Sequence, residues 1–192
     1  MKQHALYLLL VRTNTGYSRL LRACTGMEYT HVSLALDRDF HALYTSGRRF
    51  SSLLLPAGFV KEGFKKRVYR QNAQAPCMVM RLKVSEAGYQ CVRAAIRHYS
   101  RHPWRYRYNV LGLPLMALNI PWARSHHWVC SQFVAQMLSL SGAATLPRPW
   151  TLMRPSDFLK MPELDILYRG PLWGCAPWPS EPSGDYLPEP AH

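Results

Sequence analysis

Cys130 and His31 are the two residues whose types and positions best suit nucleophilic catalysis in this sequence. Cys130 lies in the segment WVCSQFVAQML, at residues 128–138, where apolar residues begin to recur at helical spacing. We therefore expect its thiol at the start of a helix, where unpaired amides and the helix dipole favour the reactive thiolate. The same amides can stabilise an oxyanion. His31 starts an alternating segment and is the natural base for the thiol.

Both residues also have an ordinary structural explanation. A cysteine beside an apolar helix is commonly a small buried hydrophobic residue, and a histidine on a strand is commonly just hydrogen-bonded. His126 and His127 lie near Cys130 in the sequence, but ligands at these spacings on one segment do not converge on a metal without further partners. We expect no metal site and no cofactor.

Alternation and helical spacing predict the elements that hold these residues. In residues 31–37, Val32, Leu34 and Leu36 face one side of a strand while His31, Ser33 and Ala35 face the other. A helix capped by Ser85 places Arg93, Arg97 and Arg101 on one face, and Gly142 follows the helix that Cys130 begins. We expect strands over 5–12, 31–37, 41–46 and 77–84, helices over 19–24, 86–100 and 129–140, and a loop over 51–72.

The 192 residues, 48% of them hydrophobic, are enough for one domain with its own core. We place this domain at residues 1–170 and expect a poorly ordered proline-rich tail at 171–192. No apolar run reaches the roughly 18 residues that a membrane-spanning helix needs. The apolar segment near the amino terminus lacks a small-residue cleavage site, so we interpret it as a strand of a cytoplasmic protein. Five scattered cysteines indicate reduced thiols rather than a disulfide framework.

The chain is strongly basic, with 24 Lys and Arg against 11 Asp and Glu and a net charge of +13. No acidic residue occurs between Ala87 and Ser156. Such a charge attracts polyanions or anionic lipid head groups, or it only aids solubility. Arg48 and Arg49 are candidates for binding an anionic group of a substrate or for covering the sheet edge. Arginine and tyrosine alternate over residues 105–108. This pattern is typical either of tyrosines that stack on nucleic-acid bases or of a basic strand whose tyrosines face the core.

Several segments together resemble one known family. They are Tyr29-Thr-His-Val-Ser-Leu-Ala-Leu36, Leu43-Tyr-Thr-Ser-Gly-Arg-Arg49, Gly58-Phe-Val-Lys-Glu62, Tyr106-Arg-Tyr-Asn-Val-Leu-Gly112 and Cys130-Ser-Gln-Phe-Val-Ala135. In this order they resemble the circularly permuted papain-like cysteine hydrolases of the NlpC-type superfamily, which also contains lecithin:retinol acyltransferase-like enzymes. The histidine preceding the cysteine is the order of the permuted branch. The resemblance implies an α+β fold with a small antiparallel sheet packed against the cysteine helix, and a Cys130–His31 dyad.

The third catalytic group is less well defined by the resemblance. The family usually has a polar residue on the strand after the histidine, where this chain has Tyr44 and Thr45, with His41 slightly earlier. Glu62 is an alternative, as the only carboxylate between Asp39 and Glu86. A buried carboxylate there would favour the imidazolium, whereas an exposed one would only form a salt bridge in a lysine-rich loop.

Two classes of function follow. The first is a cysteine-dependent hydrolase or acyltransferase acting on a peptide, amide or lipid-ester substrate, with an anionic membrane surface as a further partner. The apolar stretch at residues 111–120 would suit an acyl chain. The second is a noncatalytic basic module for an anionic membrane or nucleic acid, of which nucleic acid is the less favoured partner. It would use the arginine helix and the loop at residues 61–70.

Overall fold

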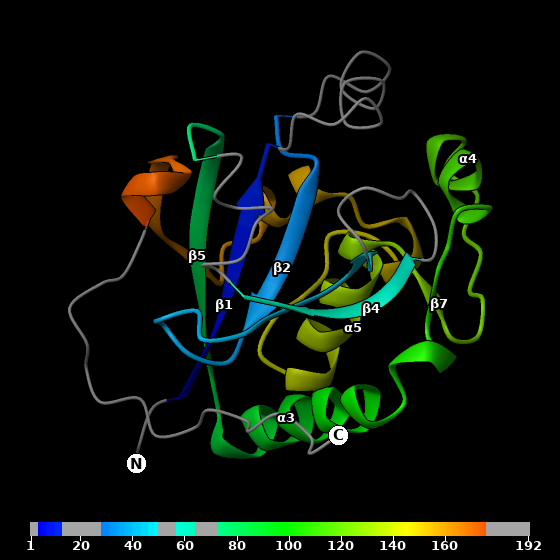
Figure 1. Cartoon of the computed structure of the whole chain (residues 1–192), viewed down its shortest axis with the longest axis horizontal. Coiled ribbons are helices and arrows are strands. Elements are labelled where there is room, and N and C mark those ends of the chain that lie inside the picture. The colour runs from blue at the N-terminus through cyan, green and yellow to red at the C-terminus, as the bar shows by residue number, and fades with distance from the viewer. Residues whose placement is uncertain (1–3, 13–27, 50–56, 64–72, 176–192) are drawn as a thin grey trace.

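The computed structural model describes residues 4–12, 28–49, 57–63 and 73–175. In this part of the chain the strands form one sheet in the order β7-β6-β4-β3-β2-β1-β5-β8 (Figure 1). The strands are β1 (His4–Val11), β2 (His31–Ala35), β3 (Leu43–Arg48), β4 (Ala57–Glu62), β5 (Pro76–Val84), β6 (Arg107–Tyr108), β7 (His127–Trp128) and β8 (Leu164–Pro171).

The helices are α3 (Glu86–Arg101), α4 (Gly112–Ala117) and α5 (Cys130–Ser141), with short 3₁₀ turns η1 (Pro103–Arg105), η2 (Trp150–Leu152), η3 (Pro155–Lys160) and η4 (Leu172–Cys175). This is the α+β class that the sequence predicts. The expected small antiparallel sheet is wrong in two respects, because eight strands pair and β6 runs parallel to β7. None of the helices described is long and apolar enough to cross a bilayer.

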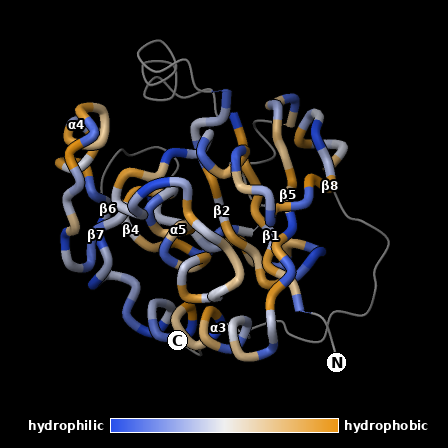
Figure 2. The backbone as a smooth tube through the Cα atoms, turned by 180° about the vertical axis from the view of Figure 1, so that it is seen from behind, coloured by the Kyte–Doolittle hydropathy of each residue, from blue (hydrophilic) through white to orange (hydrophobic). Residues whose placement is uncertain are grey.

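Apolar residues make β1 a largely buried interior strand of the sheet. It pairs with β2 on one side and β5 on the other, and both of its faces are covered. Leu8 and Leu10 belong to the main core, whereas Leu9 and Val11 belong to a second core on the other face. Burial on both faces accounts for the unbroken apolar run, which is visible as the orange trace of β1 in Figure 2.

Helices α3 and α5 pack on one another, and α5 lies against β2 and β3. The Oγ of Ser85 accepts a hydrogen bond from the amide of Gly88 at 3.1 Å, as the predicted cap requires. A side chain at Gly88 would lie 2.2 Å from the carbonyl oxygen of Ser141, so the helices approach closely here. Gly142, with φ of 65°, ends α5 in the left-handed conformation predicted.

Strand β4 corrects the expectation of a loop over residues 51–72. Phe59 is buried in the main core, and β4 pairs with β3 along its whole length. A side chain at Gly58 would lie 2.0 Å from the carbonyl oxygen of Tyr106, so glycine permits β6 to approach. The strand signal was hidden because two glycines and several lysines surround one buried aromatic residue.

The fold continues beyond the expected boundary at residue 170. Pro171 ends β8, and the side chains of Leu172 and Cys175 are buried against Cys77 and Val79 in the second core. The start of the expected tail is therefore part of the domain. Residues 176–192, the expected helix at 19–24 and Cys24 lie outside the described residues.

Candidate active site

Cys130 and His31 meet where their two elements begin. Cys130 is the first residue of α5 and His31 is the first residue of β2, both as predicted. The thiol of Cys130 lies close enough to the imidazole of His31 to influence its protonation. Cys130 is 7% exposed and also lines a pocket with Thr30, the residue before His31. The structure thus brings together the two residues that the sequence singled out.

Glu62 and Ser33 hold the imidazole from another side. The Nε2 of His31 lies 3.6 Å from Oε2 of Glu62, close enough for an ion pair. Ser33 connects them, because its Oγ lies 3.1 Å from Nε2 and donates a hydrogen bond to Oε2 of Glu62 at 3.3 Å. The side chains of His31 and Glu62 are each 19% exposed. Glu62 is therefore a partly buried partner of His31 rather than a carboxylate in an exposed loop.

These contacts shift the protonation of His31. Burial alone would lower its pKa because it disfavours the charged ring. The hydrogen bond with Cys130 and the hydrogen bond and charge of Glu62 outweigh this, and they raise the pKa of His31 from 6.5 to about 10. At neutral pH the ring is therefore an imidazolium, the form that stabilises a thiolate beside it.

Gln132 fixes the start of α5 from inside the protein. Its Oε1 accepts a hydrogen bond from the amide of Val129 at 3.0 Å, and its Nε2 donates to the carbonyl of Thr151 at 2.7 Å. The side chain is 1% exposed. Because a buried amide without partners is costly, these bonds hold the backbone directly before Cys130 and connect it to η2. The amide of Asn109 approaches the same Oε1 at 3.5 Å.

Further buried polar residues attach this helix start to the sheet. The hydroxyl of Ser46 on β3 donates to the carbonyl of Trp128 at 2.6 Å, and the backbone amide of Asn109 donates to the same oxygen at 3.1 Å. Ser131 donates to the carbonyl of Met153 at 2.6 Å. The sequence pattern does not single out these positioning residues or Gln132. Ser46 and Asn109 lie outside the helices, so the helical pattern holds no signal for them.

A small pocket opens beside Cys130. Its wall is mostly apolar and comes from α4, the start of α5 and the turn before η3. Polar groups enter it at Thr30, Tyr108 and Arg154. The guanidinium of Arg154 donates to the carbonyl of Met116 at 2.8 Å, which fixes it at the end of α4. The apolar lining residues are Leu113, Met116, Ala117, Val129 and Pro155.

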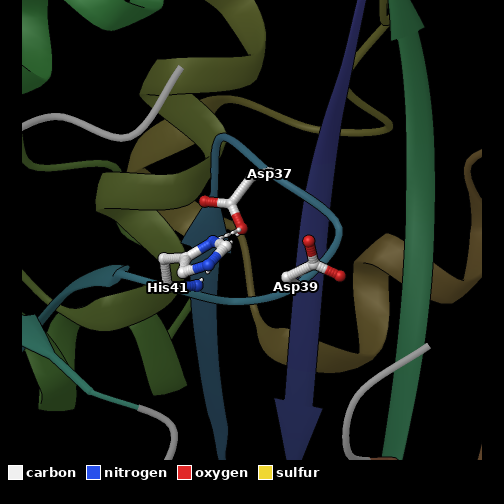
Figure 3. Close-up of side chains that lie close together, drawn as sticks. All are labelled: Asp37, Asp39 and His41. Carbon is white, nitrogen blue, oxygen red and sulfur yellow. Dashed lines mark hydrogen bonds and ion pairs between the residues drawn. The ribbon is translucent and has the colours of Figure 1, made fainter. Parts of the chain in front are cut away.

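The other two candidates for the third group lie elsewhere. His41 follows β2, at the opposite end of that strand from His31, and its Nδ1 pairs with Oδ1 of Asp37 at 2.9 Å (Figure 3). Asp39 lies nearby, and the three possible ligand atoms are within 4.8 Å of one another. Tyr44 is 2% exposed in the main core, where its ring stacks near Phe59. The structure therefore groups Glu62, and neither His41 nor Tyr44, with His31 and Cys130.

The remaining candidates of the sequence have structural contacts. His127 approaches the carbonyl of Ser125 through Nδ1 at 2.7 Å, and no metal-ligating group in the described residues contains His126, His127 and Cys130 together. Arg49 donates to the carbonyls of Pro103 and Tyr106 and lies over the ring of Trp104. Arg49 thus connects the end of β3 to the η1 turn, and the structure tests neither of the two roles considered for it.

The sequence and the structure were also compared with known proteins. No family model matches the sequence, and the comparisons with curated proteins and with solved structures return no match.

Proposed function

We propose that this protein is a cysteine-dependent hydrolase or acyltransferase that acts on an amide or acyl-ester bond. The single observation that carries the proposal is the contact of Cys130, at the first position of α5, with a His31 whose ring is also held by Glu62 and Ser33. A nucleophile, a base and a group that orients the base are the three parts of such a site.

The reaction has two balanced steps. The Cys130 thiolate attacks the carbonyl carbon, and the oxygen acquires the negative charge near the amides of the first turn of α5. The imidazolium of His31 gives its proton to the leaving amine or alcohol, and a thioester to Cys130 remains. Water, or another acceptor, then gives a proton to His31 as it attacks the thioester, which releases the acyl group and restores the Cys130 thiolate and the His31 imidazolium.

Glu62 acts as a positioning residue in this scheme. Because Nε2 of His31 is directed at Ser33 and Glu62, Nδ1 is the ring nitrogen that exchanges the proton with Cys130. The negative charge of Glu62 stabilises the imidazolium formed in the first step. The pocket lined by Leu113 and Met116 accepts an apolar part of the acyl group.

The order of the motifs supports a permuted papain-like fold for this site. The histidine strand precedes the cysteine helix, and the resemblance of the Thr-His-Val-Ser and Cys-Ser-Gln-Phe-Val segments to that family falls on β2 and α5. An α+β architecture with the cysteine helix packed on the sheet agrees with this assignment.

Trapping of the acyl-enzyme tests the proposal. The protein is incubated with a p-nitrophenyl ester of a short fatty acid, and the acylated peptide is identified by mass spectrometry after acid quenching. We expect a burst of one p-nitrophenol per chain, with the acyl group on Cys130. Cys130→Ala should abolish the burst, while Cys91→Ala, which removes an exposed thiol, should leave it unchanged. Acylation spread over several cysteines, or a burst that survives Cys130→Ala, would overturn the proposal.

A further inference from the structure

The turns that precede and follow α4 expose five large apolar side chains. Their exposed fractions range from 37% for Trp122 to 69% for Leu118. In both views α4 projects from the edge of the molecule near β7, well away from α3 (Figures 1 and 2). We call this surface the apolar tip, and it consists of Val110, Leu111, Leu118, Ile120 and Trp122.

The inner side of α4 already satisfies the packing of this helix. Met116 is buried with Val129 and Leu152, and Leu113 packs against the same cluster. The residues of the apolar tip are therefore not needed to attach α4 to the domain. A group of exposed large hydrophobic residues on one projection is typical of an interaction surface.

Two arginines border the segment that carries the apolar tip. The guanidinium of Arg124 lies 5.6 Å from the ring centre of Trp122, and Arg107 is exposed on β6 just before the tip. No carboxylate occurs in the sequence between residues 87 and 156, so none from this segment neutralises these arginines. Apolar side chains with a tryptophan, bordered by arginines, match the layers of an anionic bilayer surface.

We propose that the apolar tip docks on anionic lipid bilayers, with Leu111 and Leu118 entering the acyl-chain boundary and Arg107 and Arg124 contacting lipid phosphates. This interaction goes beyond the proposed function and does not require Cys130 to react. Docking in this orientation also places the pocket of Cys130 next to the bilayer, because Leu113 and Met116 of α4 line that pocket.

Vesicle co-sedimentation tests the docking surface. The full chain is mixed with phosphatidylcholine vesicles that contain or lack phosphatidylglycerol, and binding is expected only with the anionic lipid at moderate salt. Leu111→Ser with Leu118→Ser should weaken binding at least about tenfold. The matched control is Leu140→Ser with Ile166→Ser, which changes two exposed apolar residues on α5 and β8 and should have no effect.

A second pair of variants tests which arginines contribute to vesicle binding. Arg107→Gln with Arg124→Gln should weaken binding about tenfold, whereas Arg97→Gln with Arg101→Gln removes the same charge from α3 and should have a smaller effect. Equal losses in the two charge variants would show only nonspecific attraction and would overturn the proposal. Three other results would also overturn the proposal. They are unchanged vesicle binding in the apolar-tip variant, a dimer that depends on the apolar tip without binding to vesicles, and binding through the apolar tip to RNA alone.

Cys130→Ser separates this proposal from the proposed function. The variant should bind vesicles like the unmodified protein, because docking uses no thiol chemistry. Loss of acylation with vesicle binding retained supports both proposals. Failure of vesicle binding in a protein that still forms the acyl-enzyme rejects the docking surface alone.

Discussion

Oε2 of Glu62 on β4 lies 3.6 Å from Nε2 of His31 on β2, although strand β3 separates the two in the sheet. Glu62 pairs in register with Leu43, so its side chain must reach along and across the sheet to His31. Ser33, two residues after His31 on β2, bridges the pair through its hydroxyl. The charge that favours imidazolium therefore comes from a strand that the sequence pattern did not predict.

Selective alkylation should show whether His31 activates the thiol of Cys130. At about pH 6 His31 is protonated, and a positive charge beside a thiol makes the thiol more reactive. Iodoacetamide should therefore label the 7% exposed Cys130 faster than the exposed Cys91. Peptide mass spectrometry measures both rates in one sample. His31→Gln should slow the alkylation of Cys130 at least about tenfold and leave the alkylation of Cys91 unchanged. Faster labelling of Cys91 than of Cys130 in the unmodified protein would contradict activation of Cys130 by His31.

Glu62→Gln should retain the shape of the site and remove its negative charge. The pKa of His31 should then fall from about 10, because one of the groups that raise it is neutral. NMR of the ring protons of His31 measures this change, and we expect the pKa to fall by about one pH unit, which corresponds to about 1.4 kcal/mol. The matched control is Glu86→Gln, which alters the pair of Glu86 with His4 at the start of α3. Equal effects of the two variants would show that Glu62 has no specific role.

Stability should depend on pH through His31. Its pKa is raised from 6.5 to about 10 in the folded protein, so the folded state binds the proton more tightly than the unfolded state. The resulting stabilisation is complete below the unfolded pKa and is lost as the pH rises through the folded pKa. The stability of the unmodified protein relative to His31→Gln should thus fall between about pH 6.5 and about pH 10, by at most roughly 1.4 kcal/mol per pH unit.

Urea unfolding at several pH values measures this difference. Other groups titrate in both proteins, so their contributions largely cancel. A constant difference between the unmodified protein and His31→Gln across this range would contradict the raised pKa of His31.

The sequence predicts that both residues of the dyad lie at the start of their elements. His31 starts an alternating segment, and Cys130 starts a helical pattern that ends at a glycine, so local signals suffice to place both residues. Glu62 was named as a candidate, but its strand was not predicted. The pairing of β4 depends on contacts that are distant in sequence, such as the close approach of Tyr106 to Gly58, and no local pattern records them.

The end of the domain illustrates the same limit. Prolines and few aliphatic residues after Gly170 suggested a tail, yet Leu172 is 2% exposed and Cys175 is 0% exposed. The amide of Leu172 donates to the carbonyl of Ala75 at 2.9 Å, a contact across nearly a hundred residues. The composition of a segment indicates its average polarity, but it does not show that a single leucine of that segment packs into the second core.

Leu172→Ala should therefore destabilise the protein by about 2–4 kcal/mol, through lost burial and the cavity left behind. The neighbouring Trp173 is 62% exposed, so Trp173→Ala is a matched control with an expected change within about 0.5 kcal/mol. Thermal or urea unfolding measures both. If the two variants lose similar stability, Leu172 does not belong to the second core.

Gln132→Ala should affect both stability and reactivity. The change removes the acceptor of the Val129 amide and the donor to the Thr151 carbonyl, and it leaves both backbone groups buried without these bonds. We expect a loss of about 1–3 kcal/mol in the free energy of unfolding. The control is Gln136→Ala, one turn later on α5 at a partly exposed position, and it should lose less stability.

Because Val129 precedes Cys130 directly, Gln132→Ala should also slow alkylation of Cys130 under conditions where the variant is still fully folded. A Gln132→Ala protein that is destabilised but alkylates at the unmodified rate would show that Gln132 supports the fold without positioning the thiol.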